Sequence, residues 1–586
     1  MVQFISKHKL AITLLIAFLY QLLCIIQGFD LSDEGWLMYF CQQIFKNPEC
    51  VEAQMPYWFT GIIGGAWYEL WPGGGFFFMR FLGISINTLM AYLIYTFLKR
   101  FIDNPLLLLG LLVQVVVVAG DPKPFGYNPL SAFLVIFVII LFFSGMEQKK
   151  LSHLFLGGII LGLNFFVRLP NISYLVFILL IPIYHYIKYN KIVIINKEML
   201  ISILGVLTAV LICIVSMKSL GHWNLYLNSL TDTIASASDE TNSHQLGAML
   251  LVYLKNYKGI FLVGLFFIGI GVFYSYSTNK IKSIYYKRII QIILLFFISY
   301  LSIMLNKALR HNDMYFVNFI SLLGIILLFI NRKKESYRLK FIGLASLFMV
   351  LFISIGSDKG IKTMWTSTWL SLPFATAYIY KCIRGFKFKI RNTEVLVSRK
   401  SIIEYSLIVS IVYFVTGIYK VDYQAYYDPG SRCEKLYAID NKFTRLVYTN
   451  EYRAKITNEL LEKLPEYIKP NDYLLAYDFI PGINYMTDTR SYTPNSWIWC
   501  YSGHKFEYEL KKAVIQKKEL PVIVRQHFIA TNRWGDYDKN FYNENRIETG
   551  YFKKKRTQVI NSFILENKYI SVWNNKNYEI LIPSKK

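Results

Sequence analysis

The sequence predicts a polytopic α-helical membrane protein with a C-terminal α/β domain. Hydrophobic residues make up 54% of the 586 residues and aromatic residues 17%, which is a high apolar content for a water-soluble chain of this length. Most apolar residues lie in long runs of roughly the 17–25 residues that a helix needs to cross a bilayer. After residue 418 these runs shorten to strand length, and charged residues and Asn become frequent.

The apolar runs divide the first part of the chain into about thirteen predicted spans. These lie at 10–28, 76–98, 104–119, 130–146, 151–167, 171–187, 198–218, 259–277, 289–305, 315–331, 340–356, 365–380 and 402–418. Basic residues precede the first span but no small-residue cleavage site follows it, so we expect a retained helix rather than a removed signal peptide. The predicted domains are a transmembrane domain over 1–418 and an α/β domain over 419–586.

The net charge of +25 is concentrated in alternate connections between the apolar runs. Examples are Lys99 with Arg100, Lys149 with Lys150, and the basic run at 381–400. Basic connections mark the cytoplasmic side of membrane proteins, which explains the charge better than nucleic-acid binding does. The N-terminus is therefore predicted to be cytoplasmic, and an odd number of spans makes the C-terminal domain extracytoplasmic.

The last part of the chain alternates helical and strand patterns. Helices are predicted over 451–468, 505–517 and 554–566, strands over 473–477 and 521–525, and a closing hairpin from 569–573 and 578–582 around the turn 574–577. A segment of this size is large enough for its own core. No internal repeat and no nucleotide-binding glycine motif is found in the sequence.

The segment Gln27–Phe45 follows the first span and carries two adjacent carboxylates, Asp33 and Glu34. Ser32 is a suitable N-cap, which places both acids in a first helical turn. Apolar residues recur every four positions after it, at Trp36, Phe40 and Ile44. The pattern predicts a short helix in the membrane interface with an acid-bearing start. An acid pair in a solvated loop is an equally compatible interpretation.

A second outside connection, Gly120–Leu130, is rich in Pro and Gly. These residues fix an irregular backbone at the water boundary, as expected for a loop that lines a cavity. Its polar side chains are Asp121, Lys123, Tyr127 and Asn128. Two later connections carry further candidates for binding an anion, namely Arg310 and His311 in 306–315, and Lys359 and Lys362 in 356–365.

Arg168 lies between two apolar runs, in FFVRLPN, where Pro170 breaks the helical pattern. A guanidinium in that position needs a partner, and a bound phosphate is a suitable one. A snorkelling arginine, or a salt bridge to Asp121, is an equally compatible interpretation.

Two cysteine pairs share predicted outside regions, and an oxidising compartment permits each to form a disulfide. Cys41 and Cys50 lie in the first outside loop, and Cys433 and Cys500 in the C-terminal domain. Free buried thiols are an equal alternative for the second pair.

Carboxylates early in the chain and cations later, all on one membrane face, suit one reaction class. Transfer of a sugar from a lipid phosphate to a hydroxyl needs a carboxylate that deprotonates the acceptor. It also needs cations that stabilise the departing phosphate. A donor with a long apolar tail explains why the site lies at the bilayer boundary.

The chain resembles the GT-C superfamily of polyprenyl-phosphate-sugar-dependent glycosyltransferases, in the branch of protein O-mannosyltransferases and the lipid A aminoarabinose transferase. The matching features are the acid pair after the first span, the helix after it, the second acid-containing loop, the many-span body and the C-terminal domain. The segment Tyr473–Arg490, YLLAYDFIPGINYMTDTR, is similar to the start of that domain in bacterial members.

The resemblance implies that Asp33 is the catalytic base, that Glu34 orients the loop or a cation, and that Asp121 holds the acceptor or a metal. Among the cations, Arg168 and Arg310 are our first choices for the phosphate because bidentate geometry suits it. The other candidates for substrate binding are Lys123, Tyr127, Asn128, His311, Lys359 and Lys362. The implied reaction inverts the anomeric centre in one displacement.

The resemblance also implies the partners and the compartment. The donor is a polyprenyl-phosphate sugar, and the acceptor is an envelope glycan, lipid or protein, in the cytoplasmic membrane of a bacterium. The sequence requires no cofactor, and a divalent metal is compatible with it although its ligands are not identified.

Three alternatives come from other classes. A transporter or flippase of lipid-linked glycans would show internal repeats and ionisable positions in mid-helix. A polysaccharide polymerase or ligase would use a lipid diphosphate donor and a large outside loop rich in Arg and His. A non-catalytic scaffold would leave the polar outer loops unexplained.

Overall fold

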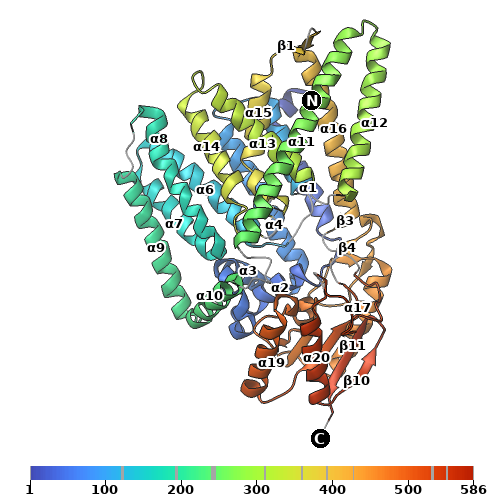
Figure 1. Ribbon diagram of the computed structural model, residues 1–586. Helices are drawn as coiled ribbons and strands as arrows, with labels where there is room; N and C mark the ends of the chain where they lie inside the picture. Colours follow the sequence, from blue (N-terminus) through green and yellow to red (C-terminus); the bar gives the residue numbers. More distant parts are fainter. Residues whose placement is uncertain are drawn as a thin grey trace.

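The computed structural model describes residues 2–119, 124–191, 196–238, 246–308, 312–357, 360–363, 365–390, 393–425, 428–529, 534–549 and 552–584. The protein is mostly helical and has a sheet-containing region at its C-terminal end (Figure 1). The two chain termini lie at opposite ends of the molecule, with the helical body between them (Figure 1).

Every predicted span falls on helical structure. The helices concerned are α1 (Val2–Cys24), α4 (Gly75–Leu98), α5 (Pro105–Leu112), α6 (Tyr127–Gln148), α7 (Leu151–Val167), α8 (Leu180–Tyr189), α9 (Lys197–Ser219), α11 (Leu246–Lys280), α12 (Ile284–Ala308), α13 (Asn312–Ile330), α14 (Tyr337–Phe352), α15 (Ser371–Cys382) and α16 (Arg399–Tyr423). Helix α16 continues past residue 418, so the sheet-containing region begins about one turn later than the predicted domain boundary.

Prolines and β-branched residues interrupt some of these helices. Pro182 lies three residues into α8, and the run Leu169–Leu179 before it is a 3₁₀ helix. Helix α15 begins only at Ser371, with Pro373 in its first turn, where a missing N–H costs nothing. The valine-rich run Val113–Val118 after α5 is a π-helix. The predicted spans at 104–119, 171–187 and 365–380 are therefore not continuous α-helices.

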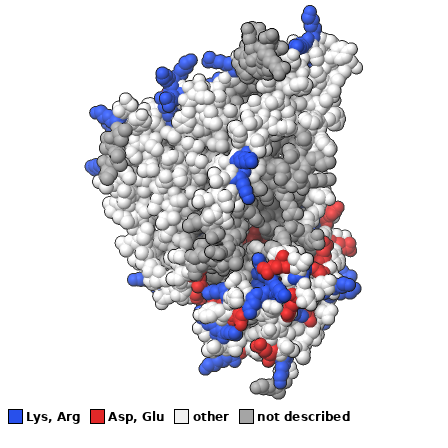
Figure 2. Space-filling model, viewed as in Figure 1, with Lys and Arg blue, Asp and Glu red and all other residues white. Residues whose placement is uncertain are grey.

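Six of the helical segments are long and apolar enough to cross a membrane, and four shorter apolar helices accompany them among the described residues. Figure 2 shows Lys and Arg at the upper end of the helical body, a mainly uncharged band below them, and both charge signs over the C-terminal region. A helix whose apolar side chains face outward in such a band is stable in the lipid bilayer. The chain is therefore a membrane protein.

Small residues bring α7 and α9 close together. A Cβ on Gly158 would lie 2.0 Å from the carbonyl oxygen of Ser202, and one on Gly205 would lie 2.2 Å from that of Phe155. Small residues at four-residue spacing allow this close backbone approach between helices in a bilayer. The pair supports the end of α7, from which Arg168 projects.

A layer of short helices lies between the helical body and the C-terminal region (Figure 1). It consists of α2 (Asp33–Gln43), the 3₁₀ helix Pro48–Tyr57, α3 (Trp58–Leu70) and α10 (Trp223–Ser238). Of these four helices, the sequence predicts only α2. Phe40 and Ile44 of α2 pack on Gly61 of α3, where a Cβ would lie within 2.5 Å of both side chains. The apolar face of α2 is thus covered by protein.

The C-terminal region contains a five-stranded mixed sheet of strand order β10-β11-β9-β7-β8. The strands are β7 (Tyr473–Tyr477), β8 (Arg490–Ser491), β9 (Val522–Gln526), β10 (Tyr569–Asn574) and β11 (Tyr578–Pro583), and the helices are α17 (Glu451–Lys463), α18 (Pro481–Thr487), α19 (Gly503–Lys517) and α20 (Lys554–Glu566). Strand β7 is parallel to β8 and β9, whereas β11 is antiparallel to β9 and β10. The predicted strands, helices and closing hairpin of this region are present.

Short two-stranded ladders complete the chain. They are β1 (Phe386–Ile390) with β2 (Thr393–Val397), β3 (Gln424–Ala425) with β4 (Asp428–Pro429), and β5 (Tyr437–Ala438) with β6 (Tyr448–Thr449). The first ladder lies in the basic connection before α16, and the other two precede α17. None of the three was predicted.

The loop after α1 is fixed by this region through backbone hydrogen bonds. The N–H of Gly28 donates to the carbonyl of Tyr448 at 2.9 Å, and that of Phe29 donates to Asp428 Oδ2 at 2.9 Å. Gly28 has a φ of +92°, and a Cβ there would lie 2.7 Å from that of Ala425, so only glycine fits. Asp428 is itself buried and paired with Arg453. The start of α2 is therefore held from both halves of the chain.

Candidate active site

Asp30, rather than the predicted Ser32, caps helix α2 with its side chain. Its Oδ2 accepts the N–H of Glu34 at 2.9 Å, and its Oδ1 accepts the N–H and the hydroxyl of Ser32 at 2.8 and 2.6 Å. Ser32 occupies the N-cap position, but its side chain makes no capping bond. Burial, with the charge of Asp33 as the second cause, raises the pKa of Asp30 to about 8. Asp30 is therefore a buried, structural acid that holds the start of α2.

Glu34 forms a buried bidentate ion pair with Arg80 of α4. The Nε and Nη2 atoms of Arg80 donate to the two carboxylate oxygens at 2.5 and 2.6 Å. The same guanidinium also donates to the carbonyls of Ile25 and Gly28 at 2.7 and 2.8 Å. Both charged side chains are 4% exposed. The charge of Glu34 is thus neutralised, and the pair ties α2 to α4.

Asp33 is the half-buried carboxylate of the segment, in the first turn of α2. Its charge acts on Tyr57 and on Cys500, because in both cases the Asp33 carboxylate raises the pKa of the neighbouring group. Trp36 lies three residues later on the same face of the helix. Asp33 therefore lies within electrostatic range of Tyr57, the last residue of the 3₁₀ helix, and of Cys500 in the C-terminal region.

Arg168 ends helix α7 in an extended conformation, with φ of −161°. The helix stops at Val167, as predicted, because Pro170 has no N–H to donate to Phe166. Arg168 is 5% exposed. Its guanidinium donates hydrogen bonds to Asn171 Oδ1, Asn128 Oδ1 and the Ile355 carbonyl at 3.2, 3.4 and 2.8 Å. No carboxylate in the described parts of the chain lies within ion-pair distance of Arg168.

Tyr57 and Tyr127 connect the acid and the cation. Their ring centroids are 4.7 Å apart, and the Arg168 guanidinium lies 5.9 Å from the centroid of Tyr127. Burial raises the pKa of Tyr57, Arg168 lowers it, and Asp33 raises it. Asp33 and Arg168, which are far apart in sequence, therefore both lie within electrostatic range of Tyr57.

Cys500 is exposed and lies within electrostatic range of Asp33. We call the group formed by Asp33, Tyr57, Tyr127, Arg168 and Cys500 the Asp33 site. All seven cysteines are free. The two disulfides that the sequence permits, Cys41–Cys50 and Cys433–Cys500, are therefore absent from this structure.

A buried ion pair supports the chain segment that carries Cys500. Arg556 Nη2 pairs with Asp478 Oδ2 at 2.8 Å, and Nη1 donates to the carbonyls of Trp499 and Tyr501 at 3.0 and 3.2 Å. Burial raises the pKa of Asp478 to about 6, and Arg556 opposes this rise. The N–H of Trp499 donates to the Asp478 carbonyl at 3.2 Å. The segment is thus fixed from α20 and from the end of β7.

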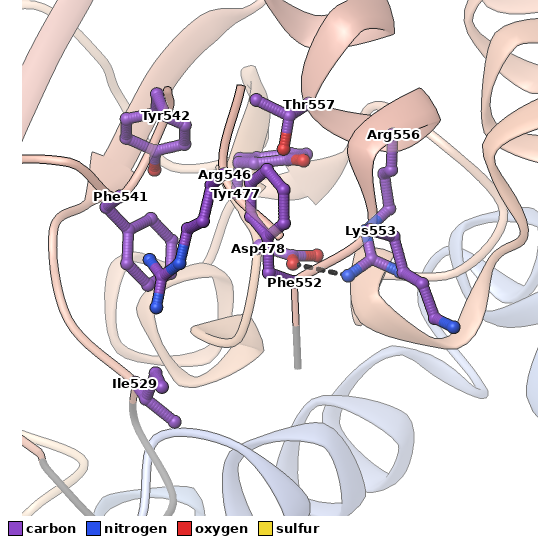
Figure 3. A pocket seen from close by; sticks show the side chains of 10 residues that line it. All are labelled: Tyr477, Asp478, Ile529, Phe541, Tyr542, Arg546, Phe552, Lys553, Arg556 and Thr557. Atoms are coloured by element: carbon purple, nitrogen blue, oxygen red, sulfur yellow. Dashed lines mark hydrogen bonds and ion pairs between the residues drawn. The ribbon is translucent and has the colours of Figure 1, made fainter. Parts of the chain in front are cut away.

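A pocket about the size of one water molecule lies beside this ion pair. Figure 3 shows Asp478 and Arg556 joined in its wall, with Phe541 and Arg546 on one side and Lys553 on the other. Arg546 is paired with Asp538 at 2.8 Å, and Lys553 with Glu548 at 3.3 Å. The pocket is therefore too small for a sugar, and its cations already have anionic partners.

The structure brings some predicted site residues together and does not describe others. Asp33, Tyr127 and Arg168 belong to the Asp33 site. Asn128 accepts a hydrogen bond from Arg168, and Glu34 is buried beside Asp33. The remaining candidates are Asp121, Lys123, Arg310, His311 and Lys359, which lie outside the described residues, and Lys362, whose backbone belongs to the 3₁₀ helix Gly360–Thr363 but whose side chain is not described. Within the described residues no three or more His, Cys, Asp and Glu side chains are grouped so as to hold a metal.

Sequence reasoning missed Asp30, Tyr57 and Arg80. Arg80 gave a usable signal, because a cation in an apolar span is rare and almost always has a partner. Asp30 lies two residues before Ser32, the predicted N-cap, and its side chain can also reach the first N–H groups of the helix. Tyr57 gave no signal, since aromatic residues are common throughout the chain.

Comparison with models of protein families gave no match, and comparison with curated protein sequences gave none. Among solved structures, the chain is similar to the archaeal oligosaccharyltransferase AglB from Archaeoglobus fulgidus in complex with an inhibitory peptide and a dolichol-phosphate. That alignment has 11% identity and a TM-score of 0.41, and covers 89% of this chain and 70% of that one.

Two further structures of the Archaeoglobus fulgidus oligosaccharyltransferase are similar. The one tethered to an acceptor peptide has 10% identity and a TM-score of 0.44, with 100% of this chain and 75% of that chain covered. The one in complex with zinc and sulfate has 10% identity and a TM-score of 0.43, with 88% and 68% covered.

Proposed function

We propose that the protein is a membrane glycosyltransferase that moves a sugar from a polyprenyl-phosphate donor to an acceptor hydroxyl, with inversion at the anomeric carbon. The observation that carries this proposal is that ring contacts of Trp36, Tyr57 and Tyr127 connect the helical turn that bears Asp33 to the guanidinium of Arg168. Asp33 is a half-buried carboxylate and Arg168 a buried guanidinium, and the reaction needs one group of each kind. The acceptor belongs to the bacterial cell envelope.

Asp33 is the proposed base because it is the half-buried acid of the segment, whereas its two neighbouring acids are buried. Glu34 is neutralised by Arg80, and Asp30 is buried and holds the start of α2. In the reaction the acceptor oxygen attacks the anomeric carbon while its proton passes to the Asp33 carboxylate. The bond between the anomeric carbon and the phosphate oxygen breaks, and its electron pair stays on the phosphate.

Arg168 is the proposed ligand of that departing phosphate. A buried guanidinium with only neutral oxygen partners among the described residues keeps an uncompensated charge, which favours a bound anion. Its position at the end of a membrane-spanning helix suits a donor whose lipid tail stays in the bilayer. Of the candidates outside the described residues, we propose that Asp121 holds the acceptor or a divalent metal, and that Arg310 assists Arg168.

Donor turnover by purified protein in lipid nanodiscs tests this proposal. The probe is a polyprenyl-phosphate-linked radiolabelled sugar, with an extract of bacterial envelope as acceptor, and the measured product is free polyprenyl phosphate. Loss of one general base costs roughly 10²–10⁴-fold in rate, so we expect a loss of that size for Asp33→Asn. Glu49→Gln is the matched control, because Glu49 is an exposed acid in the next helical segment.

Two results would overturn the proposal. Full activity of Asp33→Asn removes the carboxylate as base, and turnover of only the polyprenyl-diphosphate-linked sugar identifies a polymerase or ligase instead. Arg168→Gln provides an independent check, because we expect it to weaken donor binding, so that a higher donor concentration recovers part of the rate.

A further inference from the structure

A row of aromatic rings runs from the C-terminal region to Arg168 past Asp33. Its members are Phe479, Trp499, Trp497, Trp36, Tyr57 and Tyr127. Successive ring centroids are 5.3, 5.5, 6.1, 5.7 and 4.7 Å apart. Five segments of the chain contribute to it, so the row is a property of the folded molecule rather than of one helix. We call these six residues the aromatic row.

The aromatic row is accessible along part of its length. Trp499, Trp36, Tyr57 and Tyr127 are each partly exposed, whereas Phe479 is 1% exposed and Trp497 8% exposed. Cys500, the neighbour of Trp499, is exposed. The buried members therefore support the row from within the protein, and the partly exposed members present ring surface to a ligand.

Polar groups accompany the rings, and the charged groups among them are Asp33 and, at the end of the row, Arg168. The Asn495 Oδ1 atom accepts the indole N–H of Trp36 at 3.1 Å and the backbone N–H of Trp497 at 3.0 Å. The indole N–H of Trp497 and the hydroxyl of Ser496 have no acceptor or donor among the described residues. A buried donor without a partner costs free energy, which a hydroxyl-bearing ligand would recover.

The row is held rigidly. The Arg556–Asp478 ion pair fixes the backbone on both sides of Cys500, and Asn495 joins the loop before Trp497 to α2. Groups whose geometry is fixed before binding lose little conformational entropy when a ligand arrives. Such pre-organisation is expected of a binding surface and is not needed for a core.

We infer that the aromatic row is the acceptor site and that the acceptor is a neutral glycan chain. This inference rests on the proposed function, because it takes Asp33 as the group that receives the acceptor proton. A pyranose ring has a flat apolar face of C–H groups, which packs on the electron-rich face of an aromatic ring. Its rim of hydroxyls matches the neutral polar groups between the rings. A glycan lying along the row would present one hydroxyl to Asp33.

Other acceptors fit the row less well. An acyl chain would leave Ser496 and the indole N–H of Trp497 unsatisfied. A polyanionic acceptor would meet the Asp33 carboxylate. Arg168, at the end of the row, is the proposed ligand of the donor phosphate, and Arg556 of the C-terminal region is already paired. A peptide would need backbone partners, and the row offers ring faces instead.

Equilibrium binding tests the inference independently of turnover. The protein in lipid nanodiscs is studied by saturation-transfer difference NMR with cellohexaose, maltohexaose, mannohexaose and chitohexaose as probes and a neutral hexapeptide as comparison. We expect at least one oligosaccharide to bind. Removing one stacked ring should weaken that binding roughly 2–10-fold, so Trp499→Ala is expected to show a loss in that range and Trp499→Phe a smaller one.

The control is Trp71→Ala, because Trp71 is exposed and packs on Phe78, away from the row, and it should bind as the unaltered protein does. Asp33→Asn should bind the oligosaccharide while it loses turnover, which separates this inference from the proposed function. The inference is overturned if no oligosaccharide binds, if Trp499→Ala binds equally well, or if the hexapeptide binds instead in a manner that depends on Trp499. If a substitution at Trp499 prevents folding, Tyr57→Ala gives the same test from the other side of Asp33.

Discussion

Three carboxylates lie within five residues at the start of α2, and their surroundings separate their tasks. Asp30 is buried and accepts the hydrogen bonds that begin the helix. Glu34 is closed off by its ion pair with Arg80. Of these three acids, Asp33 is the one that is half-buried. Environments that differ in this way are how one segment can carry both structural and reactive acids.

Replacing Arg80 by Leu should destabilise the protein strongly. The substitution leaves Glu34 buried without its cation and removes the donors to the carbonyls of Ile25 and Gly28. Removing one partner of a buried ion pair costs about 3–5 kcal/mol. We therefore expect a loss of that size in the free energy of unfolding, measured by denaturant unfolding in detergent.

Two comparisons make the Arg80 experiment decisive. Arg100→Leu is the control, since Arg100 is exposed just after the same helix, and it should change the free energy of unfolding by less than about 0.5 kcal/mol. The double variant Glu34→Leu with Arg80→Leu should recover part of the loss, because no unpaired charge remains. Equal stability of Arg80→Leu and the unaltered protein would mean that the ion pair does not hold α2.

At the residue scale, the sequence revealed only those site residues whose position is unusual by itself. Asp33 and Glu34 follow a long apolar run, and Arg168 interrupts one. In the structure, Asp33 and Arg168 belong to the Asp33 site, and Glu34 is buried beside Asp33. Tyr57 and Trp499 could not be recognised, because their contacts are with residues that are far away in sequence.

At the element scale, α2 is positioned by a glycine-to-glycine contact with α18. A Cβ on Gly35 would lie 2.6 Å from both the N and Cα atoms of Gly482. The N–H of Gly482 also donates to the Leu31 carbonyl at 2.9 Å. No side chain fits between the two helices, so their close contact fixes the position of the first turn of α2, which carries Asp33.

Gly35→Ala should therefore lower both stability and activity. The added methyl group forces the two helices apart, and overpacking of this kind costs about 1–3 kcal/mol. Displacement of a catalytic group by about 1 Å can cost 10²-fold in rate, so we expect at least a tenfold loss of donor turnover in nanodiscs.

Gly73→Ala is the matched control for this variant, because a Cβ on Gly73 would have its nearest contact at an ordinary 3.6 Å. We expect it to unfold at the same temperature as the unaltered protein and to keep its turnover. Normal turnover of Gly35→Ala would show that Asp33 does not depend on the contact with α18.

The helices and the main strands followed from hydrophobic patterning, whereas the layer around α2 did not. Apolar runs of span length have one stable solution in lipid, so the sequence places them well. Helix α3 is apolar but too short to span, and it contains three glycines that pack against α2 and Phe125. Its existence depends on those contacts rather than on its own pattern.

At the scale of the whole molecule, the arrangement of charge predicts that the C-terminal region is extracytoplasmic. A membrane-impermeant maleimide applied to intact cells tests this. Cys433 is exposed, so a variant with Cys500→Ser should be labelled from outside at Cys433. A second variant, Lys150→Cys with Cys433→Ser and Cys500→Ser, places the exposed thiol between α6 and α7, and it should be labelled only after the cells are permeabilised. The reverse pattern would invert the predicted orientation.

The loop that leads into α2 is completed by chain made much later. Phe29 donates to Asp428, which lies 399 residues further along. At a synthesis rate of roughly 5–20 residues per second, on the order of 20–80 s pass between the emergence of these two residues from the ribosome. During that interval the loop before α2 lacks its partner Asp428. The order of translation thus leaves this loop without its final support until the C-terminal region has been made.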